Sequence, residues 1–287
     1  MVRYENGAAI VPLPGGINLS ATFDCGQAFR WRALPDGGYE GIAGGYRAAI
    51  RAVEAGISIT PCSQAEYEGF WRFYLDIDHD YTADERALLA DASMLPVVHC
   101  CSGMRILNQP MWECLLSFLL SSNNNVKRIA SIIERLSACF GEDMGGYHAF
   151  PTPQALARAG EEAIFTCGAG YRAAYVYRSA CAVAEGFDLE RLRRMGYDAA
   201  KAELMTLHGV GSKVADCVLL FSCGHRCAFP VDVWVKRSVP LYFPEAGTTP
   251  KELLAFADRH FGDRAGLAQQ MIFHYERVCR AEENSPA

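Results

Sequence analysis

The pattern of hydrophobic and polar positions changes along the chain. In residues 39–60, apolar positions nearly alternate with polar ones and glycines mark the turns, which is typical of antiparallel strands. Residues 66–76 have the spacing of an amphipathic helix. From about residue 110 onward, apolar positions recur at helical spacing almost throughout. The pattern predicts an α+β protein, in which an antiparallel β-sheet domain with helices precedes a mostly α-helical domain.

The boundary between the two parts is expected near residue 105. This gives an N-terminal α+β domain of residues 1–105 and a helical domain of residues 106–287. Gly141 is placed to end one helix, and Asp232 occupies the N-cap position of another, within VDVWVKR. Further helices are predicted over residues 111–121, 125–140, 152–159, 171–185, 198–206, 212–222, 250–261 and 265–279.

Length and composition exclude several classes of protein. A chain of 287 residues with 51% hydrophobic content buries a sizeable core, and 21% charged residues argue against wholesale disorder. No stretch approaches the roughly 20 apolar residues of a membrane helix, and no secretory signal is visible. We therefore expect a soluble, cytoplasmic monomer. The net charge of −6 argues against an extended nucleic-acid surface, but a local basic patch suffices to bind a few phosphates.

The twelve cysteines are irregularly spaced, and many occupy apolar patterns. Without an export signal they are expected to be reduced and to pack as small hydrophobic side chains. Cys223 and Cys227 flank His225 and could form half of a metal site with Cys279, but no second pair completes it. A structural role is favoured, and no metal or organic cofactor is expected.

The stretch LHGVGSKVADCVLL, residues 207–220, carries the first chemical signal. A helix, the connection HGVG and a second helix form a helix–hairpin–helix, and the free amides where the second helix begins suit a phosphate. Gly209 and Gly211 permit positive φ and allow a DNA backbone to come close. An ordinary helical hairpin would show the same GVG, so this signal alone does not decide the function.

Lys213 and Asp232 add the second signal. Lys213 lies in the first turn of a helix, where the helix dipole disfavours a cation, and Cys217 shares its face one turn on. A lysine that gives up its proton can attack an electrophilic carbon and form a Schiff base. Asp232 follows Pro230 among apolar neighbours, and a fixed carboxylate can stabilise a sugar cation and move protons. The pair suits cleavage of an N-glycosidic bond. A solvated lysine and a capping aspartate are the plainer alternatives.

Four other stretches accompany LHGVGSKVADC…FPVDV: CGQAFRWR (25–32), SFLLSSNNNVKRI (117–129), GAGYRAAYV (168–176) and AGLAQQMIF (265–273). Together, from about residue 20 to 280, the chain resembles the 8-oxoguanine DNA glycosylase/lyase family of the helix–hairpin–helix–Gly/Pro–Asp superfamily. The resemblance implies a bifunctional DNA glycosylase and AP lyase of base-excision repair. Such an enzyme extrudes 8-oxoguanine opposite cytosine from double-stranded DNA, excises it, and nicks the strand by β-elimination. Lys213 matches the catalytic lysine and Asp232 the catalytic aspartate.

The resemblance also implies a pocket for the extruded base. Cys217 and Phe273 match the residues that sandwich the base, and Gln269 matches the residue on its Watson–Crick edge. Gly26 matches the glycine whose carbonyl accepts the N7–H that only the oxidised guanine has. These residue types suit the task, because thiol and aromatic faces stack and an amide both donates and accepts. Each alone could equally be core.

A second set of matched residues implies contacts with the rest of the DNA. Asn123 and Arg128 match residues that fill the vacated space and read the orphaned cytosine. Tyr171 matches a side chain wedged beside that cytosine, and Arg172 another that contacts it. Gly209 and Gly211 belong to the hairpin that grips the backbone.

Some positions depart from the family pattern. His208 stands where the hairpin usually has proline, and Trp234 where animal members have a histidine that touches phosphate. Only Cys279 lies in the last fifty residues, so no iron–sulfur cluster is expected, although a cation could bridge the hairpin to phosphate. Two alternatives remain: an alkylated-base glycosylase of the same superfamily, and a non-catalytic DNA-binding helix–hairpin–helix module.

Overall fold

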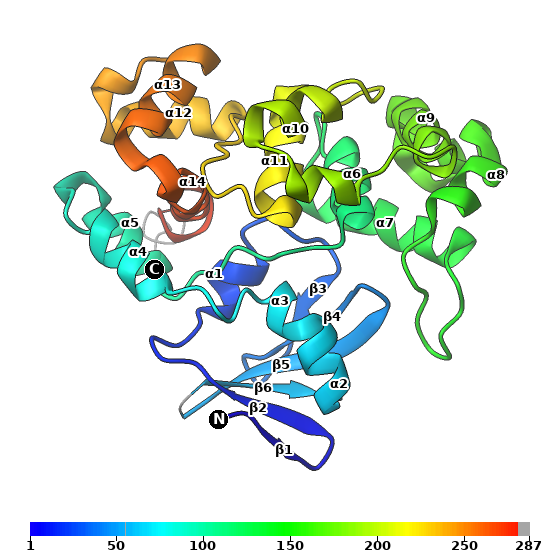
Figure 1. The fold of residues 1–287 in the computed structure, drawn as a ribbon, viewed down its shortest axis with the longest axis horizontal. Helices are drawn as coiled ribbons and strands as arrows, with labels where there is room; N and C mark the ends of the chain where they lie inside the picture. The colour runs from blue at the N-terminus through cyan, green and yellow to red at the C-terminus, as the bar shows by residue number, and fades with distance from the viewer. Residues whose placement is uncertain (55, 281–287) are drawn as a thin grey trace.

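The structure, a computed structural model, describes residues 1–54 and 56–280. A six-stranded antiparallel sheet with the order β1-β2-β6-β5-β4-β3 forms the N-terminal part (Figure 1). The strands predicted within residues 39–60 are confirmed, and β1 to β3 extend the sheet at both edges. The strands are β1 (Arg3–Glu5), β2 (Ala8–Pro12), β3 (Trp31–Ala33), β4 (Tyr39–Ala43), β5 (Tyr46–Val53) and β6 (Gly56–Thr60).

One face of the sheet is covered by a helix. The helix predicted over 66–76 is found over 64–74, as α2 (Gln64–Glu66), a π-helical turn (Tyr67–Trp71) and α3 (Arg72–Tyr74). It begins two residues early because Ser63 and Glu66 form a capping box. The buried side chains of alternate strand positions pack with those of the helix into one core, which includes Val11, Ile50, Ile57, Ile59, Trp71 and Tyr74.

The helical part contains every helix that the spacing predicts. α8 runs past its predicted end, but Gly160 interrupts it with a φ of 83°. The helices are α6 (Met111–Leu120), α7 (Val126–Phe140), α8 (Pro153–Ile164), α9 (Ala173–Ala184), α10 (Tyr197–Leu204), α11 (Ser212–Cys223), α12 (Val233–Tyr242), α13 (Pro250–Phe261) and α14 (Ala265–His274), which continues as a π-helical turn (Tyr275–Cys279). None of the described helices has the length and apolar character of a membrane span.

Three helices of the N-terminal part were not foreseen: α1 (Leu19–Phe23), α4 (Tyr81–Leu88) and α5 (Leu95–Cys101). Figure 1 shows α4 and α5 beside the C-terminal helix α14 rather than over the sheet, and their buried side chains share the core of the helical part. The boundary near residue 105 stays a prediction, but packing joins α4 and α5 to the helices that follow it.

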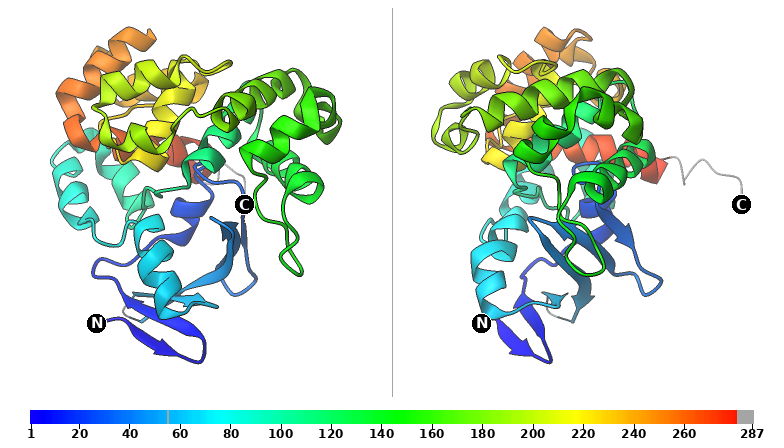
Figure 2. Two further views of the ribbon diagram at one scale, coloured as in Figure 1. Left: turned by 45° about the vertical axis from the view of Figure 1, so that its right-hand side comes forward. Right: turned by 90° about the vertical axis from the view of Figure 1, so that its right-hand side faces the viewer.

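The loop between α7 and α8 descends from the helical part toward the sheet (Figure 2). There the hydroxyl of Tyr147 donates to the carbonyl of Gly45, at 2.9 Å, in the turn between β4 and β5. This loop and α1 therefore tie the two parts of the molecule together.

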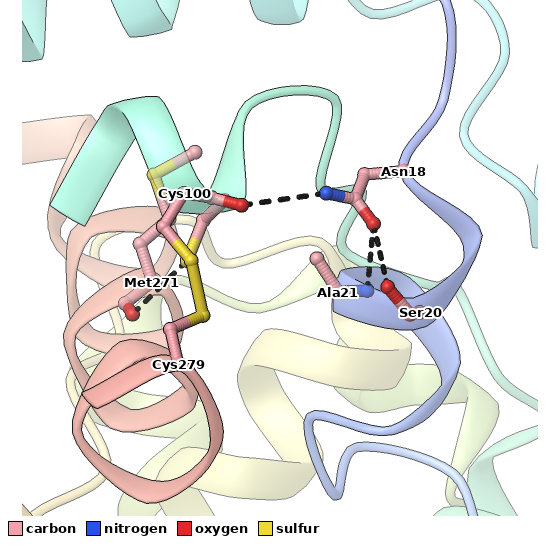
Figure 3. Close-up of a disulfide and its surroundings, with 7 residues drawn as sticks. Asn18, Ser20, Ala21, Cys100, Met271 and Cys279 are labelled. Atoms are coloured by element: carbon pink, nitrogen blue, oxygen red, sulfur yellow. Dashed lines mark hydrogen bonds between the residues drawn. A yellow bond between two sulfur atoms is a disulfide. The ribbon is translucent and has the colours of Figure 1, made fainter. Parts of the chain in front are cut away.

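The cysteines require a correction, because Cys100 and Cys279 form a disulfide (Figure 3). The packing of α14 on α5 brings these cysteines together across 179 residues, which no local spacing reveals. The sulfur of Cys101 lies within 4.8 Å of both sulfurs, and it contacts the carbonyl of Met271. Cys279 is therefore bonded to Cys100, with Cys101 beside it, rather than serving as partner to Cys223 and Cys227. Other cysteines, including Cys114 and Cys217, are buried free thiols as expected.

Candidate active site

The hairpin between α10 and α11 confirms the predicted helix–hairpin–helix geometry. Gly209 has a φ of 85°, and a Cβ there would lie 2.4 Å from the ring of Tyr175, so only glycine fits. Gly211 differs from the expectation, because its φ is −93° and it serves as the exposed N-cap of α11. A glycine there leaves the first amides of α11 open to solvent, where an anion can reach them.

A buried ion pair holds the two hairpin helices together. The carboxylate of Asp216, on α11, lies 2.8 Å from Nζ of Lys201, on α10, and accepts from the hydroxyl of Tyr197 at 2.6 Å. Burial raises the pKa of Asp216, and Lys201 opposes that shift. The pair fixes the angle at which α11 leaves the hairpin, and with it the position of Lys213.

Lys213 is half-buried and points across the cleft to the end of α6. Its Nζ donates to Oγ of Ser121 at 3.0 Å and lies 4.9 Å above the ring centre of Phe118. Cys217 lies one turn along α11, and burial raises the pKa of its thiol to about 12, an effect that Lys213 opposes. The thiol is therefore neutral at physiological pH, and the amine of Lys213 lies against the hydroxyl of Ser121 and the ring of Phe118.

Asp232 lines the same cleft from the start of α12. One of its carboxylate oxygens accepts from the amide of Val235 at 2.8 Å, which confirms the predicted N-cap. That bond orients the carboxylate, and Asp232 lines the same cleft as Lys213. A fixed anion beside an amine can stabilise positive charge that develops on a substrate between them.

α14 provides the far wall of an inner cavity. Gln269 is 4% exposed, and its Oε1 has no hydrogen-bond partner among the described residues. Phe273, one turn along the same helix, lines this cavity together with Cys217 and Gly26. The cavity holds about 40 Å³. A buried amide oxygen without a partner is costly, so this position suits a ligand that donates a hydrogen bond.

Gly26 lies in a loop that buried amides hold rigidly. The side chain of Gln27 donates to the carbonyls of Thr22 and Arg105, both at 2.8 Å, and accepts from the amide of Leu107. Gln270, on α14, donates to the carbonyl of Cys25 at 3.1 Å. With a φ of +81°, Gly26 is thus a fixed piece of backbone at the cavity wall.

An outer cleft of about 540 Å³ opens from this cavity toward solvent. It is lined by residues from the Gly26 loop, the starts of α7, α11 and α12, and the last turns of α14. Trp234 is 45% exposed and lines the cleft. Basic side chains at the starts of α7 and α12 are exposed, namely Lys127, Arg128, Lys236 and Arg237. The overall negative charge is therefore compatible with a basic patch at this cleft.

A short turn between α6 and α7 carries Asn123 to the surface. Asn123 is exposed and has a φ of 45°, a conformation that asparagine tolerates better than most residues. Arg172 lies beneath the turn, 3% exposed, and donates to the carbonyls of Ser122 and Asn123, both at 2.6 Å. Tyr171 is 52% exposed, and its ring lies against the guanidinium of Arg172. The structure therefore brings these predicted residues together, with Arg172 inside the protein.

Arg128 is exposed in the first turn of α7, where Asn125 caps the helix by accepting from its amide at 2.9 Å. Its chain neighbours Val126 and Lys127 line the outer cleft.

Sequence reasoning missed several residues of the site. No sequence pattern marked Ser121 as a site residue, because its contact with Lys213 arises from the crossing of two helices. Asp216 had a signal: a carboxylate within an otherwise apolar helix requires a buried partner. Arg277 had a signal too, because Gln269, Phe273 and Arg277 recur every four residues on one helix face.

Two family models match the chain: the N-terminal domain of 8-oxoguanine DNA glycosylase, over residues 10–115, and the HhH-GPD superfamily of base-excision DNA repair proteins, over residues 116–260. The N-glycosylase/DNA lyase OGG1 of Arabidopsis thaliana is 31% identical over 281 residues, which is 90% of this chain and 76% of the relative.

Solved structures agree over nearly the whole chain. MBOgg1 in complex with a low-affinity DNA ligand has a TM-score of 0.93 at 35% identity, covering 98% of this chain and 99% of that one. The 8-oxoguanine glycosylase/lyase of Clostridium acetobutylicum, bound to double-stranded DNA with cytosine opposite 8-oxoG, has a TM-score of 0.92 at 32% identity, covering 98% of both chains.

Proposed function

We propose that the protein acts as a monomer on double-stranded DNA that contains 8-oxoguanine opposite cytosine. The premise is that the chain belongs to the 8-oxoguanine DNA glycosylase family of the HhH-GPD superfamily. It is an N-glycosylase/DNA lyase that removes 8-oxoguanine in base-excision repair. Lys213 is the nucleophile and Asp232 the stabilising carboxylate. The observation that carries this assignment is the position of both side chains on one cleft, beside a buried amide oxygen that lacks a partner.

The chemistry begins at C1′ of the damaged nucleotide. As the bond from C1′ to the base breaks, the base leaves with the bonding electron pair, and the carboxylate of Asp232 stabilises the positive charge on the sugar. The amine of Lys213 then forms a bond to C1′ and loses a proton. The C1′–O4′ bond breaks as the nitrogen lone pair forms the C1′=N bond of a Schiff base, and O4′ takes up a proton to become the 4′-hydroxyl. Loss of a proton from C2′ expels the 3′ phosphate, and hydrolysis of the imine releases the lysine.

The inner cavity receives the extruded base. Gln269 presents its unpaired Oε1 to the donors of the Watson–Crick edge, and Phe273 and Cys217 stack on the two faces. The carbonyl of Gly26 accepts the N7–H of 8-oxoguanine, whereas guanine has a lone pair at N7 that would repel it. The cavity must widen to admit a purine, because its volume of 40 Å³ holds about three water molecules.

The turn between α6 and α7 fills the gap that extrusion leaves in the duplex. Asn123 enters the vacated space, Arg128 donates to the cytosine, and Tyr171 wedges beside it. Arg172 positions Asn123 from below through its two carbonyl contacts, since its guanidinium is buried. The amides at the start of α11 grip a phosphate of the backbone.

Borohydride trapping on duplexes with 8-oxoguanine opposite each of the four bases tests the proposal. Trapping that is strongest opposite cytosine, and absent for undamaged DNA, is the expected result. Excision of an alkylated purine such as 3-methyladenine, without excision of 8-oxoguanine, would place the protein with another branch of the superfamily. Binding without any covalent adduct would indicate a DNA-binding module.

A further inference from the structure

Arg277 occupies a position that the mechanism does not use. It follows Phe273 by one turn at the C-terminal end of α14, and its guanidinium lies 5.0 Å from the centre of the Phe273 ring. Its Nη2 donates to the carbonyl of Asp24 at 2.9 Å, two residues before Gly26. The side chain therefore spans the mouth of the base pocket from α14 to the Gly26 loop.

The second terminal nitrogen of Arg277 points to Gly26 itself. Nη1 lies 3.2 Å from the position that a Cβ on Gly26 would take, closer than any other described atom outside the immediate chain. Burial lowers the pKa of Arg277, yet an arginine so far above neutrality stays charged. A partly desolvated guanidinium with a fixed anchor is a strong directed donor.

The oxidised base offers an acceptor at this place. In 8-oxoguanine the carbonyl O8 is bonded to C8, next to N7, so a base whose N7–H faces the Gly26 carbonyl presents O8 to the same wall. Guanine has only a hydrogen at C8. We propose that Arg277 is a specificity-determining residue that donates from Nη1 to O8 of the extruded base, an inference that rests on the proposed function.

The same geometry links this donor to opening of the pocket. Phe273 lines the inner cavity, which must widen to admit a purine, and Arg277 stacks on Phe273 from the next turn of the same helical segment. Entry of the base therefore exchanges a contact with the ring for a hydrogen bond to O8. Only an oxidised base has the O8 acceptor that replaces the ring contact of Arg277. Discrimination between 8-oxoguanine and guanine is therefore coupled to closure of the pocket mouth by Arg277.

Arg277→Met, which keeps the length and removes the donors, tests the proposal. In a Lys213→Gln background, which prevents turnover, the preference for binding 8-oxoguanine:cytosine over guanine:cytosine duplex should fall by about 10-fold. Cleavage of a duplex with a preformed abasic site, measured with Lys213 intact, should stay within about twofold of wild type, since no base is present. Arg277→Lys should restore little of the preference, because an ammonium lacks the planar fork that reaches Asp24 and O8 together.

Arg280→Met is the matched control, since Arg280 pairs with Glu276 on the same segment and is not among the described residues that line the pocket. Equal losses on lesion and abasic duplexes in Arg277→Met would overturn the proposal in favour of a phosphate or purely structural contact. Faster excision with unchanged preference would also overturn it, and would make Arg277 a latch on Phe273. A wild type that cleaves abasic DNA but spares 8-oxoguanine would instead refute the proposed function. Thermal melting confirms that each variant folds.

Discussion

On the pocket side of the site, Lys213 and its neighbours extend from helices that are otherwise buried, whereas on the turn side Asn123 and Arg128 project from an exposed turn and helix start. The first side has atoms fixed by the hairpin ion pair and the amides around Gly26. On the second side, the side chains project from the protein surface into solvent.

The difference follows from what each side does. Bond cleavage requires an amine and a carboxylate held at set positions in a place with little water, which a packed helical core provides. Filling and reading a gap inside a duplex requires groups that enter the DNA, and these must protrude. We therefore expect changes at Lys213 and Asp232 to alter rates on every substrate, changes at Gly26 to alter the recognition of the lesion, and changes at Arg128 to alter the choice among opposite bases.

Lys213→Gln tests the buried side most severely. Excision should fall by roughly 1,000-fold or more, because the side chain that forms the covalent bond is lost. Borohydride should no longer cross-link protein to lesion DNA, while affinity for that DNA is retained. Undiminished trapping in the variant would show that a residue other than Lys213 is the nucleophile.

Asp232→Asn should lower the rate on the order of 100-fold, because the amide cannot carry the charge that stabilises the sugar cation. Asparagine can still cap α12 by accepting from the amide of Val235, so the melting temperature should change little. Single-turnover excision at saturating enzyme measures the loss. Near-normal turnover would reduce Asp232 to a helix cap.

Gly26→Ala should lower 8-oxoguanine excision about 10-fold or more, since a Cβ strains a φ of +81° and lies 3.4 Å from Val126 and closer still to Arg277. Cleavage of abasic DNA should be spared, because that reaction places no base against the wall. The ratio of the two activities is the readout. An unchanged ratio would show that the backbone at Gly26 does not discriminate lesions.

Arg128→Met tests the exposed side. Excision opposite cytosine should persist, but the preference over the other three bases should flatten, at about 1–3 kcal/mol for each lost hydrogen-bond match. Rates on the four duplexes provide the measurement. A uniform loss on all four, with weaker salt dependence of binding, would assign Arg128 to phosphate instead.

The smallest expected effect concerns stability. His274, on the buried side, is 3% exposed, and burial lowers its pKa, with Arg277 adding to the shift and Asp24 opposing it. A histidine whose pKa is lower in the folded state than in the unfolded state contributes stability fully at pH values above the unfolded pKa of about 6.5. That contribution is lost as the pH falls through the folded pKa. The melting temperature of His274→Leu should therefore drop less than that of wild type between pH 7 and pH 5. Parallel profiles would exclude His274 as a source of acid sensitivity.

Much of the fold was readable from the sequence because periodicity reports directly on helices that bury one face. α6, α7, α11 and α13 lie within one residue of their predicted limits. α4 and α5 escaped prediction, because they are short and their burial depends on α14, which is distant in sequence. The disulfide between Cys100 and Cys279 depends on the same long-range packing.

For the site, sequence reasoning identified side chains but not their relations. It singled out Lys213, Gln269 and Phe273, which the structure gathers at one cavity. It gave no account of Ser121 beneath the lysine, and it expected Arg172 to contact the orphaned cytosine, whereas the structure has the Arg172 side chain buried against two carbonyls. Contacts between crossing helices, and the side of a loop on which an arginine lies, follow from tertiary packing alone.

The Gly26 loop has a consequence for how such an enzyme can be recombined. The loop belongs to the strand-bearing part of the chain, yet Gln270 of the last helix and the segment around Arg105 hold it in place. Lys213 and the pocket wall at Gly26 that contacts the base therefore lie on different segments of the chain. Grafting the first hundred residues from a relative would transplant the Gly26 wall but leave the reactive centre, together with Gln269 and Arg277, native. In such a chimera, the contacts that must be matched are the buried amide hydrogen bonds that hold the Gly26 loop, rather than the linker between the domains.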